Sequence, residues 1–195
     1  MEENVKHPSA GIRRVVTGHT PDGRASVLLD EVATNVKVRE ATGGIVSTLL
    51  WVTDGSPAEL AGDTDAADRD MGVPPPARGS AFRIVEFPPY REELAQTSVE
   101  TALRDWGMEQ HALPGVKHQH PFVHRTRTID YIAVLEGEIT MLLDEGEVTV
   151  KQGDVLVQRG TNHAWINRTD KPCRLAMVFI DAQEPPEIVA LSEKK

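Results

Sequence analysis

The sequence predicts an all-β protein, built as one small barrel or sandwich with an N-terminal β extension and one short helix. Short runs rich in β-branched and aromatic residues recur along most of the chain, and Gly, Pro, Asn and Asp clusters separate them. Only one segment has helical spacing of its apolar residues. The length of 195 residues suits a single domain.

The first fifty residues are expected to form an extension of four strands. The β-rich runs cover residues 13–17, 25–29, 35–39 and 45–52. We expect these strands to extend the sheets of the barrel or to swap onto a neighbouring chain. They also allow a degenerate first half of a double barrel, although this region has no His-rich motif of its own.

Residues 54–80 interrupt the strand pattern. The segment is acidic, contains three consecutive prolines and has few apolar groups to anchor it. It is predicted to be a long surface loop, solvated or disordered, while a lid or binding element is the alternative.

The predicted helix follows Ser98, which is a suitable N-cap. Val99, Leu103 and Trp106 fall at positions i, i+4 and i+7, on one face. Gly107 is placed to end the helix in the left-handed conformation.

The second half of the chain predicts a regular series of strands joined by tight turns, as in a barrel or sandwich. The runs cover residues 81–87, 129–135, 139–143, 148–150, 155–158, 163–167 and 173–181. Three parts follow: residues 1–80 as the extension and loop, residues 81–183 as the barrel, and residues 184–195 as a C-terminal tail.

Composition excludes several classes of partner. Acidic residues outnumber basic residues 30 to 21, a net charge of −9, which argues against nucleic acid and anionic lipid as partners. No apolar run is long enough to span a membrane, and the first residues lack the apolar segment of a signal peptide. With a single cysteine, the chain has no intrachain disulfide and no multi-cysteine zinc site. We expect a cytoplasmic protein that binds a small molecule.

One strand face carries the residues that favour chemistry. Side chains alternate along a strand, so His124, Thr126, Thr128 and Asp130 share a face. Such a face is a poor core surface because each buried polar group needs a partner. It is typical of a wet cavity or a metal site. His163, Trp165 and Asn167 alternate in the same way on a second strand.

These residues and their spacing resemble the two motifs of the cupin family. His124, Thr126, Asp130 and Gly137 match the spacing H-x-H-x3-E-x6-G, and Gly153, Gly160, His163 and Asn167 match most of the second motif. Thr126 replaces a histidine, Asp130 a glutamate, Gln158 a proline and His118 the first glycine. The resemblance covers about residues 115–181. It implies a cupin-type β-barrel, of the jelly-roll or double-stranded β-helix kind.

Cupins typically hold a metal ion with three His and one Glu. Carried over by position, the resemblance implies that His124, Asp130 and His163 bind a divalent transition metal: iron, zinc, manganese or nickel. Alternatively, the site binds no metal, and His124 acts as a general base or lines the pocket. Trp165, Asn167, His118 and His120 are the further pocket candidates, although an exposed loop is the simpler interpretation of the last two.

Three functions follow from this resemblance. The first is metal-assisted lyase, dehydratase or isomerase chemistry on a small oxygenated substrate. A metal-bound water or His124 would remove a proton next to a carbonyl group, and the metal, or Thr126 and Thr128, would stabilise the enolate or leaving hydroxyl group. Asp130, as a metal ligand, completes the catalytic candidates. The second is a non-haem iron dioxygenase using the same site, and the third is a non-catalytic ligand-binding cupin. Because a free strand edge favours pairing between chains, we also expect a homodimer.

Overall fold

The computed structural model describes residues 11–109 and 120–187, and almost all of its regular structure is β-strand. The strands are β1 (Arg13–His19), β2 (Ala25–Val32), β3 (Val36–Arg39), β4 (Ile45–Thr53), β5 (Ser80–Phe87), β6 (Thr128–Glu136), β7 (Glu138–Leu143), β8 (Glu147–Lys151), β9 (Val155–Arg159), β10 (His163–Ile166) and β11 (Cys173–Asp181). The helix α1 spans Val99–Trp106, and the 3-10 helices η1 and η2 span Glu40–Thr42 and Glu92–Gln96. Every predicted strand and the predicted helix are present, within a few residues of the expected bounds.

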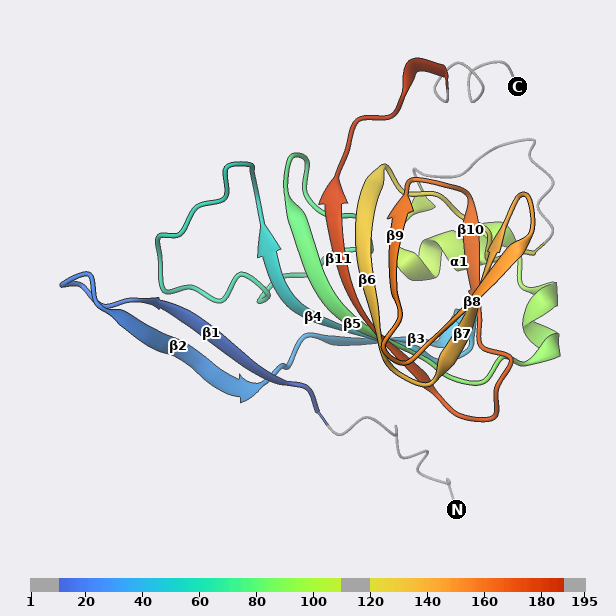
Figure 1. The fold of residues 1–195 in the computed structure, drawn as a ribbon, viewed down its shortest axis with the longest axis horizontal. Helices are drawn as coiled ribbons and strands as arrows, with labels where there is room; N and C mark the ends of the chain where they lie inside the picture. Colours follow the sequence, from blue (N-terminus) through green and yellow to red (C-terminus); the bar gives the residue numbers. More distant parts are fainter. Residues whose placement is uncertain (1–10, 110–119, 188–195) are drawn as a thin grey trace.

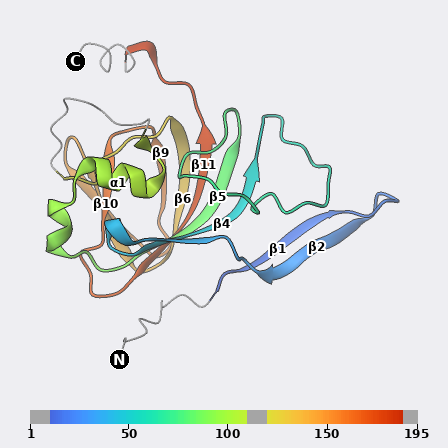
Figure 2. The ribbon, with the colours of Figure 1, turned by 180° about the vertical axis from the view of Figure 1, so that it is seen from behind.

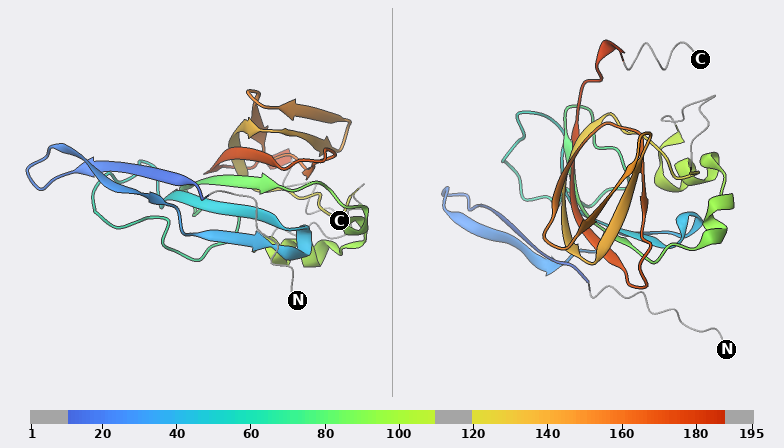
Figure 3. Two further views of the ribbon diagram at one scale, coloured as in Figure 1. Left: turned by 90° about the horizontal axis from the view of Figure 1, so that it is seen from below. Right: turned by 45° about the vertical axis from the view of Figure 1, so that its right-hand side comes forward.

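Two antiparallel sheets form the barrel. The larger has the order β3-β4-β5-β11-β6-β9, and the smaller has the order β10-β7-β8. In Figure 1 the larger sheet lies in the middle of the molecule, and in the right-hand view of Figure 3 the smaller sheet closes against it. β3 and β4 therefore extend the barrel's own sheet, as expected, whereas the same expectation is wrong for β1 and β2, which pair only with each other.

The central strand β11 illustrates how the sequence specifies the larger sheet. It pairs with β5 on one side and β6 on the other. Cys173, Leu175, Met177 and Phe179 all point into the barrel and are at most 5% exposed. They join a core cluster with side chains of β5, β6, β7 and β10.

β1 and β2 form a separate two-stranded sheet that projects from the barrel as an arm (Figures 1 and 2). The inner end of the arm is fixed by Arg14, which is 6% exposed. Its guanidinium group donates to Glu31 at 2.6 Å, to Asp65 at 2.7 Å and to the carbonyl oxygen of Leu50 at 3.1 Å.

The prediction that residues 54–80 are solvated or disordered is wrong for part of this segment. Ala67 is 1% exposed and packs against the outer strands of the larger sheet. Asn35 donates to the carbonyl oxygens of Ala67 and Arg69 at 2.7 and 2.8 Å. The few apolar side chains of the loop are therefore placed where the sheet buries them, which composition alone does not reveal.

The helix α1 has the predicted ends. The side chain of Ser98 accepts a hydrogen bond from the Thr101 backbone N–H, and Gly107 has φ = +64°. Gly107 also lies against Gly72, where a Cβ atom on Gly72 would stand 2.5 Å from the Gly107 oxygen. This contact holds the loop before β5 against the end of the helix. No helix among the described residues is long and apolar enough to cross a membrane.

Candidate functional site

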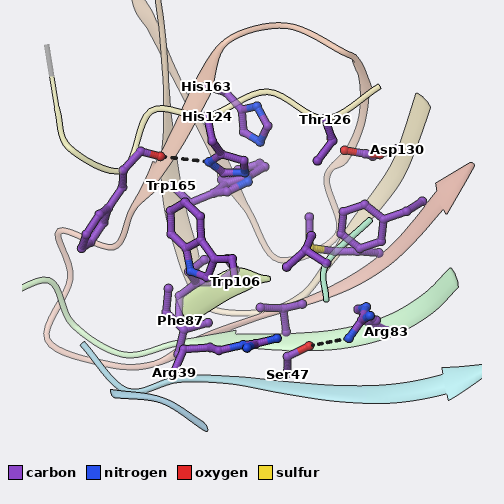
Figure 4. Close-up of a pocket in the computed structure, with 16 residues that line it drawn as sticks. Arg39, Ser47, Arg83, Phe87, Trp106, His124, Thr126, Asp130, His163 and Trp165 are labelled. Atoms are coloured by element: carbon purple, nitrogen blue, oxygen red, sulfur yellow. Dashed lines mark hydrogen bonds between the residues drawn. The ribbon is translucent and has the colours of Figure 1, made fainter. Parts of the chain in front are cut away.

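A pocket lies between the two sheets of the barrel and beside α1 (Figure 4). About 80 Å³ of it can be reached by the centres of water-sized molecules. Because one water needs roughly 10–15 Å³ by this measure, the pocket has room for several waters or a small organic molecule. Its walls are mostly apolar, and its polar side chains are Arg39, Ser47, Arg83, His124, Thr126, Asp130 and His163.

The two predicted histidines meet in this pocket. His124 precedes β6 and forms an isolated antiparallel bridge with His163 at the start of β10. Their backbones exchange two hydrogen bonds, each 3.0 Å long. Residues directly opposed in an antiparallel pair place their side chains on the same side, so the ring centroids lie 4.5 Å apart.

The backbone constrains the protonation of His124. Its Nδ1 atom lies 2.9 Å from the carbonyl oxygen of Phe122. Since a carbonyl oxygen only accepts, Nδ1 carries the proton in this contact, and the lone pair of a neutral ring is on Nε2. An imidazole in this tautomer can accept a proton or bind a metal ion through Nε2.

His163 has two possible partners for its Nδ1 atom, both at 2.9 Å. One is the carbonyl oxygen of Thr161, which only accepts, and the other is the amide Nε2 of Gln158, which only donates. Paired with Thr161, the ring has its lone pair on Nε2; paired with Gln158, it has its proton there. His163 can thus present either a donor or an acceptor through Nε2 without moving. Burial, and then the neighbouring His124, lower the pKa of His163 to about 3, so the ring is neutral at pH 7.

Asp130 occupies the same pocket, on the inner face of β6. The carboxyl group is 1% exposed, and its Oδ1 atom has no hydrogen-bond partner among the described residues. Burial raises the pKa of Asp130 to about 6, and a hydrogen bond from Thr128 partly opposes that shift. The hydroxyl groups of Thr128 and Thr126 are 2.7 Å apart. If Thr128 donates its single proton to Asp130, Thr126 must donate to Thr128, which links the pocket-lining Thr126 to the carboxyl group.

The residues present do not fit the predicted three-ligand metal site. His124, Asp130 and His163 line one pocket, as predicted. However, in residues 11–109 and 120–187 no group of three or more His, Cys, Asp or Glu side chains is arranged to hold a metal ion. Thr126, at the place of a further histidine ligand in the cupin motif, is engaged with Thr128.

Aromatic side chains form the wall next to the histidines. The ring centroids of Trp106 and His124 are 4.7 Å apart, and Phe122 packs edge-on against Trp106 at 5.8 Å. Trp165 is 8% exposed and also lines the pocket, as predicted. Trp106 is therefore a pocket residue as well as the core residue that the helical pattern predicts.

Two predicted pocket residues lie elsewhere. Asn167 does not line the main pocket; its amide donates to the carbonyl oxygens of Phe87 and Lys171, at 2.9 and 2.7 Å, and so fixes the turn before β11. The prediction that Asn167 shares a face with His163 assumed that both lie on one strand. β10 ends at Ile166, so Asn167 lies outside the strand and its side chain does not follow the alternation. His120 packs against Phe122 and contacts the Tyr90 hydroxyl at 2.9 Å, outside the pocket lining. His118 lies outside the described residues.

Arg39 and Arg83 are pocket residues that the sequence interpretation missed. Arg83 lies on β5 at the same parity as Val85 and Phe87, and Arg39 ends β3. The sequence did mark Arg83, because it falls at the alternating positions of β5 that otherwise carry inward-facing apolar residues. No local pattern marks Arg39, because β3 reaches the pocket only through its pairing with β4.

The fold and the pocket define a class of protein: a small β-barrel that encloses a mostly apolar pocket with a few polar side chains. Comparison with known proteins identifies the family. Residues 108–179 match the model of the cupin domain. The chain is 31% identical to the cupin-domain-containing oxidoreductase fogC of Aspergillus ruber, over 92% of this chain and 78% of that protein. This chain belongs to the cupin family.

Further relatives have similar coverage. The cupin-domain-containing oxidoreductase srdD of Neurospora crassa is 30% identical, over 91% of this chain and 80% of its own length. The phomopsin biosynthesis cluster protein C' of Diaporthe leptostromiformis is 31% identical, over 89% and 79%. Among solved structures, the cupin domain of Schizosaccharomyces pombe Cnp3 aligns with a TM-score of 0.42 and 12% identity, covering 87% of each chain.

Proposed function

We propose that this cupin is an enzyme that moves a proton on a small oxygenated organic substrate, as a lyase, dehydratase or isomerase does. The observation that carries the proposal is the pair of bridged imidazoles that shares a pocket with the buried carboxyl group of Asp130. Proton transfer next to a carbonyl group needs a base for one atom and an acid for another.

The two histidines suit different roles in such a reaction. His124 has its Nδ1 proton directed to the Phe122 carbonyl oxygen, so Nε2 is the basic atom that removes a proton from substrate carbon. His163 stays neutral because its pKa is about 3; with Gln158 as its Nδ1 partner, it can donate a hydrogen bond from Nε2 to a substrate oxygen. The mostly apolar wall around them lowers the local dielectric constant, which strengthens electrostatic interactions in the pocket.

Asp130 is the group that supplies or accepts the second proton. Its raised pKa keeps an appreciable protonated fraction near neutral pH, so it can protonate a leaving hydroxyl group or an enolate oxygen. Thr126 and Thr128 orient this carboxyl group and connect it to the pocket.

A second function, oxidation of the substrate, is supported by the names of the relatives. Two of them are called cupin-domain-containing oxidoreductases, at 30–31% identity over more than 90% of this chain. A non-haem iron dioxygenase in this pocket needs bound iron, whereas the proposed proton transfer uses only the chain's own residues. Metal content and oxygen uptake therefore separate the two candidates.

The test follows exchange of substrate hydrogen with solvent. The purified protein is incubated in D2O with a panel of β-keto and β-hydroxy acids and the matching ketones, and deuterium incorporation or loss of water is measured by mass spectrometry. We expect turnover that is lost in His124→Asn and kept in His19→Asn, a control change at an exposed histidine of the β1 arm.

Oxygen uptake and metal content are measured on the same samples. Iron-dependent oxygen uptake without proton exchange overturns the proposal in favour of an oxidoreductase. Thermal stabilisation by ligands without any turnover overturns it in favour of a binding protein.

A further inference from the structure

Two arginines line the side of the pocket that faces the histidine pair. Arg83 comes from β5 and Arg39 from the end of β3, so both belong to the larger sheet. In Figure 4 their guanidinium groups lie at one end of the cavity, and His124 and His163 lie at the other. Apolar side chains such as Val85, Phe87 and Met177 also line this pocket.

Arg83 is a buried charge with incomplete partners. The residue is 2% exposed. Its guanidinium group donates to the Ser47 hydroxyl at 3.3 Å and to the Gly72 carbonyl oxygen at 2.5 Å, while Nε has no partner among the described residues. Burial and the charge of Arg39 lower the pKa of Arg83 to about 10, so it remains cationic at pH 7.

Arg39 has a similar environment. It donates through Nη1 to the Asp105 carbonyl oxygen, and its buried Nε and Nη2 atoms have no partner in the described part of the chain. The nearest acidic side chains are already engaged: Asp105 accepts from Thr42, and Asp70 accepts from Lys37. Burial lowers the pKa of Arg39, and these two carboxylates oppose the shift.

The same chain pairs its other buried arginine. Arg14, 6% exposed, contacts the carboxylates of Glu31 and Asp65 at 2.6 and 2.7 Å. In contrast, none of the ion pairs among the described residues includes Arg39 or Arg83. The internal segment 110–119 contains no Asp or Glu in its sequence. Among the described residues, these two cations therefore line the pocket without an ion pair, although the carboxyl group of Asp130 lines the same pocket. An unpaired buried cation is costly unless an anion enters.

The geometry points to Arg39 and Arg83 as the binding site for the carboxylate of a small organic acid, whose apolar body lies along the pocket toward the histidines. Guanidinium groups match the planar, two-oxygen shape of a carboxylate and bind it with charge-assisted hydrogen bonds. The unpartnered Nε and Nη2 atoms supply the donors. The assignment of a substrate class rests on the proposed function, since it places the acid's carbonyl or hydroxyl carbon at His124 and His163. Binding of the carboxylate itself does not depend on turnover.

Binding of unreactive probes tests this site. Benzoate, phenylacetate and 3-phenylpropanoate are compared with their neutral amides by titration calorimetry on the full chain. We expect at least one acid to bind ten-fold or more tightly than its amide. Arg83→Met and Arg39→Met should each weaken acid binding about ten-fold or more and leave amide binding unchanged. Arg127→Met, at an exposed arginine that pairs with Asp181 outside the pocket, should change neither.

The variants also distinguish this inference from the proposed function. If Arg83→Met does not fold, Arg39→Met carries the test, because Arg39 is only half-buried. His124→Asn should keep the preference for acids while losing proton exchange. Equal binding of acids and amides, or an equal loss in Arg127→Met, overturns the anion site even if exchange is observed. A retained preference without any exchange supports the anion site and rejects the proposed function.

Discussion

Replacing Asp130 with asparagine should change how stability depends on pH. In the native protein burial raises the pKa of this carboxyl group from 3.8 to about 6. The native state therefore binds a proton more tightly than the unfolded chain does. By linkage, the contribution of Asp130 to the unfolding free energy is largest below pH 4, falls as pH rises from about 4 to 6, and stays low above pH 6.

The size of the effect follows from the shift. A rise in pKa from 3.8 to about 6 corresponds to about 3 kcal/mol of unfolding free energy. The asparagine side chain would have no charge to bury, so the Asp130→Asn variant should gain about 3 kcal/mol relative to the wild type between pH 4 and pH 7. Any cost of the asparagine amide is independent of pH and shifts the whole curve.

Denaturant unfolding at half-unit steps from pH 4 to pH 8 measures this difference. Other titrating groups, His163 included, are common to both proteins and cancel in the comparison. Asp63→Asn, at an exposed carboxylate in the loop before β5, is the matched control for the removal of one carboxylate. If the Asp130→Asn difference is flat, the buried carboxyl group does not titrate as argued, and its role as the acid is rejected.

Three further predictions concern acid stability, packing and assembly. The pKa of His163 is about 3 in the native state and near 6.5 in the unfolded chain, so this group alone should remove about 1.4 kcal/mol of unfolding free energy per pH unit as pH falls from about 6.5 to 3, against the opposite contribution of Asp130. His163→Asn should therefore be less destabilised by acid than the wild type in the same unfolding titration, and equal slopes would contradict this. Gly72→Ala should lower stability by about 1–3 kcal/mol in thermal unfolding, because the added Cβ atom would stand 2.5 Å from the Gly107 backbone oxygen. Gly55→Ala should be neutral, because the nearest atom to its Cβ, the Pro57 backbone oxygen, is 3.9 Å away. Equal stabilities of the two variants would refute the packing argument. We propose a homodimer through the edge strand β9, where Val157 is 59% exposed. Val157→Asp should raise the dimer Kd at least ten-fold in sedimentation experiments, and the control Val27→Asp on the arm should leave it unchanged. A monomeric wild type rejects the proposal.

Local patterns in the sequence were enough to predict most of the fold. Alternating apolar residues and turn residues located the strands, and Ser98 and Gly107 located both ends of α1. The motif spacing also predicted that His124 and His163 share a pocket with Asp130. The strand and helix predictions succeed because each depends on side-chain alternation or backbone conformation over a few residues. The shared pocket joins distant segments, and it was implied by the resemblance to the cupin motifs.

The errors have a different physical origin. Asn167 follows the last residue of β10, so its amide turns to backbone carbonyl oxygens and not to the pocket. The loop 54–80 was assigned to solvent because its apolar residues are few, yet Ala67 is buried by the sheet beneath it. In both cases a nonlocal contact decides the position of a residue whose local sequence favours another.

Short-range sequence patterns specify the strands, the helix ends and the alternation that puts imidazole, hydroxyl and carboxyl groups on one inner face. That Arg39 and Arg83 complete the pocket became visible only in three dimensions. Both arginines reach it through antiparallel pairing in the larger sheet, where β3 pairs with β4 and β4 pairs with the more distant β5. The charge that a pocket contains depends on which strands become neighbours, and the packing of the whole sheet sets that arrangement.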